Sequence, residues 1–516
     1  MHSESSHTNL ESAVDAKGDS GKPLVTKPEL YSRRRVIAVG AILGAGIATA
    51  VVLGETTRGA PAHTGAVALP SRSFKSTRLK AQAMITEQTG ETAPGYLFIE
   101  PETTIFNGMI VDNGGEAVWI DPSGASMTDV AVQTFEGKPV LTYWSGNVAG
   151  GHGKGVGNIL DASYRTIAVV KTGPGMDADL HEFHLTPWGT ALMTAYPTEK
   201  ADLSSVGGPA SGYLLNGHIQ EVDIRTGAVL LSWSALDHVP VAETYADVKD
   251  PGDGLGKTPT TGFDAYHLNS IDYDKDGTTL YISGRHTHTI YAIDRKTGAV
   301  KWRMGGKKSD FAIDKNAQFA WQHHVRKRTD GIFTVFNNHS RTSTDPVTSS
   351  GLLLNVDEAS RTVSLQRSFD HGILSTAQGS VQPLENGNVL IGWGGNPVIT
   401  EYTGDGKLVY KATHVGSASY RSFRHEWVAH PTTKPVIAVE TKGAMSKVYV
   451  SWNGATEVRK WRIMTGKDAG SLTQAVIVAR SGFETVATVP RSSVIAVQAL
   501  DESGSIIGRS KAVLSA

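Results

Sequence analysis

The sequence lacks cysteine, and it lacks an excess of either charge, with 49 lysines and arginines against 50 aspartates and glutamates in 516 residues. The absence of cysteine excludes disulfides, thiolate nucleophiles and cysteine-ligated zinc. The balanced charge gives no support for nucleic acid as a partner, because a surface that follows phosphates needs a basic excess. Amphipathic helical patterns are scarce, while glycine and strand-forming residues are abundant, which favours an all-β fold.

Long hydrophobic runs are also rare, and the clearest one extends over the eighteen residues from Val36 to Leu53. It follows three arginines at 33–35, a pattern typical of a twin-arginine export signal with a small-residue cleavage site at 60–62. An uncleaved membrane tether through 36–53 is the alternative, because eighteen residues just suffice to span a bilayer. In both cases we expect a disordered polar segment and a signal or anchor over 1–62, and a globular part that is exported across the cytoplasmic membrane.

Four short strand-like runs lie between Gly262 and Gly306: HLNSID, TLYISGR, TIYAID and AVKWRM. Asp276-Gly277 separates the first pair, and a turn that ends in Thr297-Gly298 separates the second. Both are typical turn sequences of antiparallel hairpins. Four antiparallel strands of this length are typical of one blade of a β-propeller.

The same pattern recurs along the chain from about residue 94 to 435. An apolar residue followed by aspartate and a turn appears six times, at Asp121, Asp161, Asp223, Asp294, Asp357 and, more loosely, Asp405. The count predicts a six-bladed β-propeller over 94–435, with five or seven blades as alternatives, after a linker and lead-in over 63–93.

The pattern changes after Pro435 to short alternating strands that continue to the end of the chain. A segment of this size with a tryptophan in an early strand predicts a small immunoglobulin-like β-sandwich over 436–516. It contains no recognisable catalytic constellation, so packing or adhesion is its expected role.

Three histidines occupy matching positions in successive inner strands. His181 and His323 each lie eight residues before their turn glycine, and His267 lies ten before its own, where the turn is longer by two. Inner strands of a propeller converge on its axis, so we expect these imidazoles at one mouth. A single histidine of this kind is usually a core hydrogen-bonding residue, but three in register favour a functional site. Nearby arginines would complete an anion site: Arg285, Arg341, Arg421 and Arg424.

Two other motifs have simpler interpretations. Asp272-x-Asp274-x-Asp276-Gly277 resembles the start of a calcium loop, but its twelfth position is Ser283 rather than glutamate, so we interpret it as a hairpin turn. The glycine-rich run GGHGKGVGN at 150–158 lacks the context of a phosphate-binding loop, and we interpret it as a flexible loop. We expect neither a metal nor a cofactor.

Several long, collinear runs between about Pro94 and Pro435 resemble the arylsulfotransferase family in its actinobacterial and fungal branch. They are DLHEFHLT (179–186), GHIQEVDIRTGAVLLSWSALDHVP (217–240), YHLNSIDYD (266–274), YISGRHTHTIYAIDRKTGAVKWRMGG (281–306), FAWQHHVRKRTDGIFTVFNNHSR (319–341), GSVQPLENGNVLIGWGGNPVITEY (379–402) and SYRSFR (419–424). The resemblance implies a six-bladed propeller that moves a sulfuryl group from a phenolic sulfate ester to a phenol acceptor. It further implies a transiently sulfated histidine and no nucleotide sulfate.

By motif, the resemblance implies that His267 (in H-x-N-S), His323 (in Q-H) and Arg341 (after the Asn-Asn turn) belong to the catalytic set. His181 fits the D-x-H-E-F motif of this branch. Arg285, Arg421 and Arg424 are expected to bind substrate.

Two positions depart from the pattern of the family. Gly379 stands where another histidine would complete the set, and His324 follows His323 where an acid is expected. An inactive or repurposed homologue is therefore an alternative.

Two other functions are compatible with the sequence. One is a non-catalytic exported propeller that binds a ligand or partner. The other is a quinoprotein-like oxidoreductase, because AIDRKTGAVKW also resembles the blade motif of quinone-cofactor propellers. That motif is structural, and we find neither the calcium site nor the stacking tryptophan that a quinone needs. The oligomeric state does not follow from the sequence.

Overall fold

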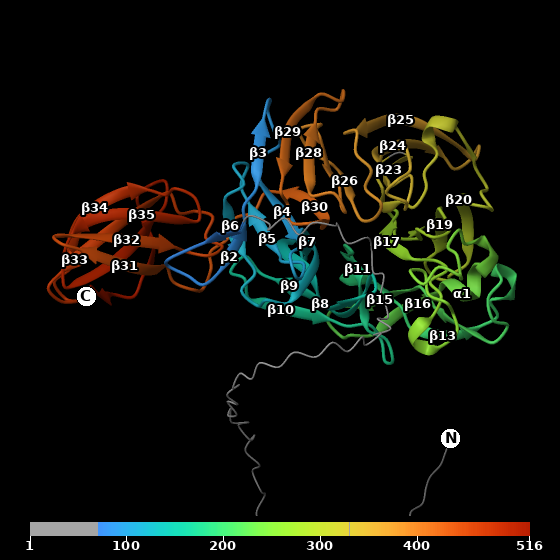
Figure 1. Cartoon of the computed structure of the whole chain (residues 1–516), viewed down its shortest axis with the longest axis horizontal. Coiled ribbons are helices and arrows are strands. Elements are labelled where there is room, and N and C mark those ends of the chain that lie inside the picture. The colour runs from blue at the N-terminus through green and yellow to red at the C-terminus, as the bar shows by residue number, and fades with distance from the viewer. Residues whose placement is uncertain (1–70, 330, 516) are drawn as a thin grey trace, which may run out of the picture. The chain divides into compact units, whose positions relative to one another are not determined.

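The computed structural model describes residues 71–329 and 331–515, and nearly all of its regular elements are strands (Figure 1). Within these residues the helical elements are α1 (Ala235–His238) and four short 3-10 turns. No helix of the described part is long and apolar enough to cross a membrane. The export segment predicted within 1–62 lies outside the described residues. The all-β class predicted from the sequence is confirmed.

The four strand-like runs between Gly262 and Gly306 form one sheet, as predicted. β17, β18, β19 and β20 follow one another as an antiparallel four-stranded sheet. Their bounds are Leu268–Tyr273, Thr279–Gly284, Thr289–Asp294 and Val300–Gly305. The turn between β17 and β18 places Gly277 at a φ of 70°, a conformation that glycine adopts without a steric cost.

Two further sheets repeat this arrangement and add a fifth strand. One has the order β21-β25-β24-β23-β22, and the other has the order β26-β27-β28-β29-β3. The bounds of the first are Ala312–Ile313, Thr362–Asp370, Ser350–Asp357, Ile332–Asn337 and His323–Lys327. The bounds of the second are Ser380–Pro383, Val389–Gly392, Val398–Tyr402, Leu408–Thr413 and Ile85–Gln88. The lead-in before residue 93 thus supplies the outer strand of a sheet whose other strands lie more than 290 residues later.

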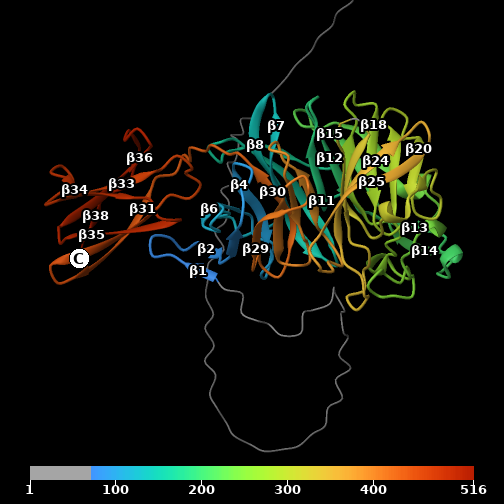
Figure 2. The same ribbon diagram turned by 90° about the horizontal axis from the view of Figure 1, so that it is seen from above.

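The chain closes on itself in the sheet β30-β4-β5-β6. β30 (Ser419–His425) pairs antiparallel with β4 (Tyr96–Pro101), and the two lie side by side in both ribbon views (Figures 1 and 2). β5 (Met109–Val111) and β6 (Ala117–Ile120) complete it. Residues from both ends of the 94–435 segment therefore share one sheet, which is how propeller-like folds avoid an open edge.

The remaining strands of this part form an eight-stranded sheet. Its bounds are β7 Ser126–Phe135, β8 Lys138–Ala149, β9 His152–Leu160, β10 Thr166–Val170, β11 Ala178–Leu185, β12 Thr190–Ala195, β15 His218–Asp223 and β16 Val229–Ser234. A single residue pair, Ala178 with Gly155, joins β11 to β9. Two small hairpins lie outside the larger sheets: β1 Ser71–Ser73 with β2 Lys80–Gln82, and β13 Thr198–Ala201 with β14 Gly212–Leu215.

The repeated aspartates cap the turns between strands. The Oδ1 atom of Asp223 accepts hydrogen bonds from the backbone N–H groups two and three residues later, at 3.0 and 2.7 Å. Asp294 and Asp357 repeat this arrangement at the ends of β19 and β24. Short polar side chains that bond their own backbone in this way define tight turns, which explains the spacing of the motif.

Large aromatic residues pack neighbouring sheets against each other. Trp233 of β16 is 1% exposed and packs with Leu192, Ile271 and Ile282 of two successive sheets. Its indole N–H donates to the carbonyl oxygen of Gly298, in the turn after β19. Each such contact fixes one sheet relative to the next and thereby the positions of the first strands that carry the predicted histidines.

Residues 436–515 form two antiparallel sheets with one shared core. One has the order β31-β32-β35, with bounds Val436–Lys442, Met445–Ser451 and Glu484–Pro490. The other has the order β34-β33-β36-β37 with β38 beside β36, and its bounds are Thr473–Ala479, Lys460–Gly466, Val494–Leu500, Ile506–Arg509 and Val513–Leu514. Val448, Trp461 and Val497 belong to the common core.

Candidate active site

Four imidazoles meet where the first strands of neighbouring sheets begin. The ring centroids of His181, in β11, and His267, just before β17, lie 4.7 Å apart, as their matching registers predicted. His152, at the start of β9, lies 5.6 Å from His181 and 5.1 Å from His267. The ring of His286 lies 4.8 Å from that of His267. These four residues are called the histidine cluster below.

Two buried carboxylates hold the histidine cluster. The Nδ1 atom of His181 lies 2.5 Å from Oδ2 of Asp179, and Nδ1 of His267 lies 2.6 Å from Oδ2 of Asp264. His152 is placed between them: its Nε2 lies 3.1 Å from Asp264, and its Nδ1 lies 3.7 Å from Asp179. Asp179 therefore faces two imidazoles and Asp264 faces three, the third being that of His286 at 3.9 Å. No cation other than these rings is paired with either aspartate in the described residues.

Local backbone geometry brings each of these two histidines onto its aspartate. The backbone N–H of His181 donates to Asp179, two residues earlier, at 3.0 Å. The backbone N–H of His267 donates to Asp264, three residues earlier, at 2.9 Å, and its φ is 48°. A positive φ in a non-glycine residue is costly and is often retained at functional sites. The motifs D-x-H and D-x-x-H thus build carboxylate–imidazole pairs directly.

The pKa values of the histidine cluster move in opposite directions. Burial lowers the pKa of His267 well below its usual range and that of His286 to about 4, against the opposing charge of Asp264. Burial acts in the same direction on His152, but hydrogen bonds and charges from Asp179 and Asp264 outweigh it and raise its pKa to about 10. The site therefore combines neutral imidazoles at His267 and His286 with an imidazolium at His152 near pH 7.

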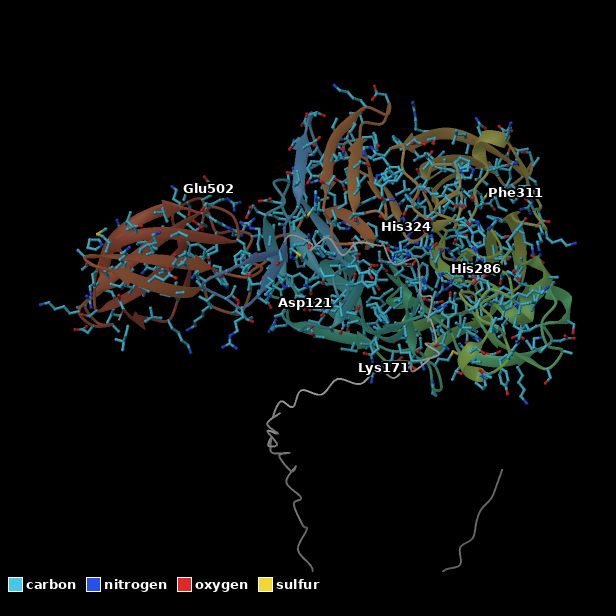
Figure 3. The ribbon with its side chains drawn as sticks, in the orientation of Figure 1. Asp121, Lys171, His286, Phe311, His324 and Glu502 are labelled. Atoms are coloured by element: carbon cyan, nitrogen blue, oxygen red, sulfur yellow. The ribbon has the colours of Figure 1, made fainter. Side chains whose placement is uncertain are left out.

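Arg285 is the predicted arginine whose guanidinium contacts an imidazole ring of the histidine cluster. Its guanidinium lies 2.6 Å from Nε2 of His286 and donates to the carbonyl oxygen of Thr376 at 3.2 Å. The guanidinium also lies 5.2 Å from the ring centroid of Trp321. Figure 3 shows His286 nearer the middle of the surrounding sheets than Phe311, which lies at their outer edge.

Arg341 lies near Arg285 but is held by loop carboxylates. Its guanidinium is 5.0 Å from the ring centroid of the same Trp321. It donates to both carboxylate oxygens of Asp253, at 2.5 and 2.6 Å, and to Asp250 at 3.0 Å. Because two carboxylates already bind it, Arg341 orients the loop around residue 250 and the face of Trp321.

Arg421 and Arg424 lie in buried ion pairs of β30. Arg421 is 1% exposed and pairs with Asp129 at 2.6 Å and Glu182 at 2.9 Å. It also donates to the backbone carbonyl oxygens of His181 and Asn269, so it supports the strands that carry the cluster. Arg424 pairs instead with Glu401 at 2.9 Å and with Asn113 at 2.6 Å, and it shares no contact with the cluster in the described residues.

His323 has partners on both ring nitrogens. Its Nδ1 lies 2.7 Å from Oδ1 of Asn338, and its Nε2 accepts a hydrogen bond from the backbone N–H of Gln378 at 3.2 Å. Asn338 in turn donates to the carbonyl oxygens of Ser375 and Gln378. The ring of His323 therefore helps to fix the segment 375–378. The same segment accepts a hydrogen bond from Arg285, through the carbonyl oxygen of Thr376.

The adjacent His324 makes a different set of contacts. Its Nδ1 accepts from the backbone N–H of Val381 at 3.2 Å. It lines a cavity of about 150 Å³ together with Glu182, Arg326 and Arg328, and no member of the histidine cluster lines that cavity. Figure 3 shows its position among the inner strands.

The position of Gly379 cannot hold the further histidine that would complete the set of the family. Its φ is 109°, and a Cβ atom there would lie 2.4 Å from the ring of Phe336. The ring of a buried phenylalanine thus occupies the space that a side chain would need.

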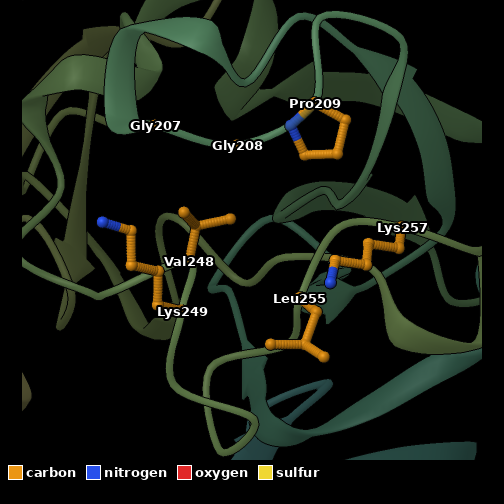
Figure 4. A pocket seen from close by; sticks show the side chains of 7 residues that line it. All are labelled: Gly207, Gly208, Pro209, Val248, Lys249, Leu255 and Lys257. Carbon is orange, nitrogen blue, oxygen red and sulfur yellow. The ribbon is translucent and has the colours of Figure 1, made fainter.

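Another cavity lies in a different part of the chain. A cavity of about 360 Å³ is lined by loop residues between 207 and 257, including Lys249 and Lys257 (Figure 4). None of its lining residues is a histidine, a carboxylate or an arginine. The histidine cluster is the better candidate for chemistry, because a reaction depends on the groups that converge and not on volume.

Four residues of this site were not predicted from the sequence: Asp179, Asp264, His152 and His286. The flexible loop predicted at 150–158 is wrong: β9 begins at His152. The glycines of this run alternate because aromatic rings cover the strand, and a Cβ at Gly153 or Gly157 would lie 2.5 or 2.2 Å from Trp144 or Phe183. Alternation of glycine with period two was the available signal, since it marks close approach to one face of a strand.

Fold and site together define an all-β, propeller-like protein with a buried cluster of carboxylate-bound histidines. The family model described as Arylsulfotransferase (ASST) matches residues 131–415, more than half of the chain. The chain belongs to this family, as its motifs indicated. The matched segment contains all four residues of the histidine cluster and both aspartates.

Comparison with solved structures gives distant likenesses. A protein of unknown function from Bacteroides caccae is 13% identical, with a TM-score of 0.39, over 64% of this chain and 98% of that one. TolB from Acinetobacter baumannii is 14% identical, with a TM-score of 0.39, over 65% and 67%. Quinohemoprotein alcohol dehydrogenase from Comamonas testosteroni is 10% identical, with a TM-score of 0.30, over 79% and 67%. Comparison with curated proteins gives no match.

Proposed function

We propose that this protein is an aryl sulfotransferase that moves a sulfuryl group from a phenolic sulfate ester to a phenol, without nucleotide sulfate. Membership of the arylsulfotransferase family supports a transferase with small phenolic substrates. The observation that carries the proposal is the pair His181 and His267, each bound through Nδ1 to a buried aspartate, with ring centroids 4.7 Å apart.

His267 is the proposed nucleophile. Asp264 accepts a hydrogen bond from Nδ1–H of His267, so the free lone pair of the ring lies on Nε2. The Nε2 atom has no hydrogen-bond partner in the described residues. In the first step the Nε2–S bond forms and the S–O bond to the aryl group breaks, and the phenoxide leaves as it takes a proton. In the second step the acceptor phenol loses its proton and attacks sulfur, and the S–N bond breaks.

His181 is the proposed acid and base for the two phenols. It stands beside His267, and Asp179 fixes its tautomer in the same way. A positioned imidazole can protonate the leaving phenoxide and then deprotonate the acceptor, so one residue serves both steps. The proton that the first step consumes is the one that the second step returns.

Positive charge for the sulfuryl oxygens is proposed to come from Arg285, next to His286. Donors aimed at developing negative charge in a site that excludes water are a major source of catalysis. Arg341 and His323 are proposed to act by positioning, through Trp321 and the 375–378 segment. Arg421 is proposed to hold the strands of the cluster, and for Arg424 the contacts indicate a structural role.

We also infer the finer architecture and the location. Dividing the eight-stranded sheet at its single β9–β11 pair gives six sheets of a six-bladed propeller. Two packed antiparallel sheets over 436–515 are compatible with an immunoglobulin-like sandwich. Export through the 1–62 segment is tested by protease accessibility on intact cells, with a variant in which the arginines at 33–35 are lysines as the control.

The activity is tested with purified protein, 4-nitrophenyl sulfate and phenol. We expect nitrophenolate release that depends on the acceptor, together with formation of phenyl sulfate. Peptide mapping after a brief reaction with donor alone should find the sulfuryl group on His267. No release with any of several phenolic acceptors would support the non-catalytic ligand-binding alternative, and a quinone chromophore would support the oxidoreductase.

A further inference from the structure

We propose that the histidine cluster is also a metal site, in which His152, His181 and His267 bind one divalent transition-metal ion of the Zn²⁺ type. Nothing in the sulfuryl transfer requires this ion, and its binding does not depend on that activity.

The three rings form a triangle of the size that a metal site needs. Their centroids are 4.7, 5.1 and 5.6 Å apart. When imidazole nitrogens bind Zn²⁺ tetrahedrally at about 2.0–2.1 Å, the centroids of two rings lie about 5 Å apart. The three rings thus already have the separation of a three-histidine site, and binding needs ring rotations rather than movement of the strands.

Each of the three rings also has an aspartate as a hydrogen-bond partner on one of its nitrogens. Each ring has one nitrogen within 3.1 Å of an aspartate oxygen, on Asp179 or Asp264. The other nitrogen of each ring makes no hydrogen bond within the described residues, and for Nδ1 of His152 this atom is also buried. Histidines that bind metals typically donate their second ring nitrogen to a carboxylate, which fixes the tautomer and increases the basicity of the free nitrogen.

The charge around the three rings also favours a cation. Asp179 is fully buried and Asp264 is 5% exposed, so two carboxylates face the same three rings away from water. Buried charges need close compensation. The His152 imidazolium now supplies it, and a dication that displaces the proton of His152 would supply it instead. The aspartates are near enough to become ligands themselves. Two groups bring three possible ligand atoms together, one from each residue and all within 4.8 Å of one another: His152, Asp179 and His181 form one group, and His152, Asp264 and His267 form the other.

The ligand types select the class of ion. Imidazole nitrogens and carboxylate oxygens without thiolates suit Zn²⁺ and its first-row neighbours, whereas Mg²⁺ and Ca²⁺ prefer all-oxygen sites. The mixed ligand set therefore predicts weak or no binding of Ca²⁺. If His267 is the nucleophile, as proposed above, its Nε2 lone pair cannot bind the ion and attack sulfur together. This consequence rests on the proposed function, and it predicts inhibition by Zn²⁺ that competes with the sulfate ester.

The test uses the full chain, stripped with a chelator and titrated with Zn²⁺ by calorimetry, with metal content measured after gel filtration. We expect one ion per chain, loss of that ion in His181→Ala and in His267→Ala, and binding about 10–100-fold weaker in Asp179→Asn. His184→Ala is the matched control, because His184 lies on the same strand, outside the cluster, and its Nδ1 bonds the carbonyl oxygen of Ile271. Unchanged Zn²⁺ affinity in the two alanine variants, or no binding by the wild type, would overturn the proposal.

Cobalt gives a second readout that does not depend on the folding of the variants. Co²⁺ bound to the wild type by three imidazoles should give the visible absorption of a four- or five-coordinate ion, and Zn²⁺ should displace it. A spectrum of an octahedral aqua ion would count against the site. The two proposals fail separately: a protein that binds Zn²⁺ but transfers no sulfuryl group overturns only the enzyme, and an active protein that binds no Zn²⁺ overturns only the metal site.

Discussion

His267 and Asp264 form a carboxylate–imidazole pair inside the protein, with Nδ1 of the histidine 2.6 Å from Oδ2 of the aspartate. The same aspartate also accepts the backbone N–H of His267, at 2.9 Å, on its other oxygen. One side chain thus fixes both the backbone and the ring of the proposed nucleophile. The pair lies just before β17, where the loop enters the first strand of its sheet.

Replacing Asp264 by asparagine should therefore disable the nucleophile without removing it. Asparagine offers an N–H₂ group as well as an oxygen, so the ring of His267 can turn or change tautomer. We expect kcat for nitrophenyl sulfate to fall by about 100-fold or more. Asp276→Asn, in the exposed turn between β17 and β18, is the matched control and should retain wild-type turnover. An Asp264→Asn variant with wild-type kcat would remove this pair from the mechanism.

His267 and His323 should respond differently to substitution by glutamine. His267→Ala and His323→Ala are each expected to abolish transfer, but for different reasons. The Nε2 atom of His323 accepts from Gln378, so His323 positions the segment that contacts Arg285. Glutamine at 323 can keep these hydrogen bonds, whereas glutamine at 267 cannot attack sulfur.

The expected result is partial recovery of kcat in His323→Gln and none in His267→Gln. Steady-state kinetics with the same donor and acceptor measures it, and circular dichroism checks the fold of all four variants. Equal inactivity of the two glutamine variants would assign His323 a direct chemical role, as the family motif first implied.

Local pattern was sufficient to predict the sheet formed by β17–β20. Its turns carry Asp276-Gly277 and Thr297-Gly298, and each strand pairs with its sequence neighbour. β3 could not be found in this way. Its sequence ITEQ has no strong strand signal, and its partner β29 lies more than 300 residues away. Pairing over that distance depends on how the whole chain folds, which no local window contains.

Some residues of the site could be predicted from the sequence, because their position within a strand decides where their side chains lie. Counting from turn glycines brought His181 and His267 together, because strand register is geometric. The same count predicted His323 beside them, but the ring of His323 bonds Asn338 and Gln378 instead. Asp179 and Asp264 were missed because the pairing occurs through backbone turns of two and three residues before each histidine. His152 was missed because its strand is rich in glycine, and the rings of Trp144 and Phe183 that cover these glycines belong to other strands.

Gly379 offers a test of why the further histidine is missing. Alanine there must accept a φ of 109° and a Cβ atom 2.4 Å from Phe336. We expect Gly379→Ala to destabilise the protein by about 1–3 kcal/mol, measured by urea unfolding. Gly387→Ala is the control, because its φ is 85° and no atom lies within 4 Å of its Cβ position.

Gly379→His should be less stable than Gly379→Ala and should gain no activity. Equal stability of Gly379→Ala and Gly387→Ala would show that the contact with Phe336 is unimportant.

Glu100 in β4 predicts how stability varies with pH. Burial raises its pKa from 4.5 to about 8, although the backbone N–H groups of Val130 and Arg421 donate to it. The folded protein therefore holds this proton more tightly than the unfolded chain does. The stabilisation is fully present below about pH 4.5 and is lost as the pH rises through 8, by at most about 1.4 kcal/mol per pH unit.

Glu100→Gln keeps the side-chain shape and one acceptor oxygen but cannot ionise. Relative to the wild type, this variant should gain free energy of unfolding between pH 5 and 8 in urea titrations. A difference between the two proteins that does not change with pH would mean that Glu100 ionises at its ordinary pKa despite its burial.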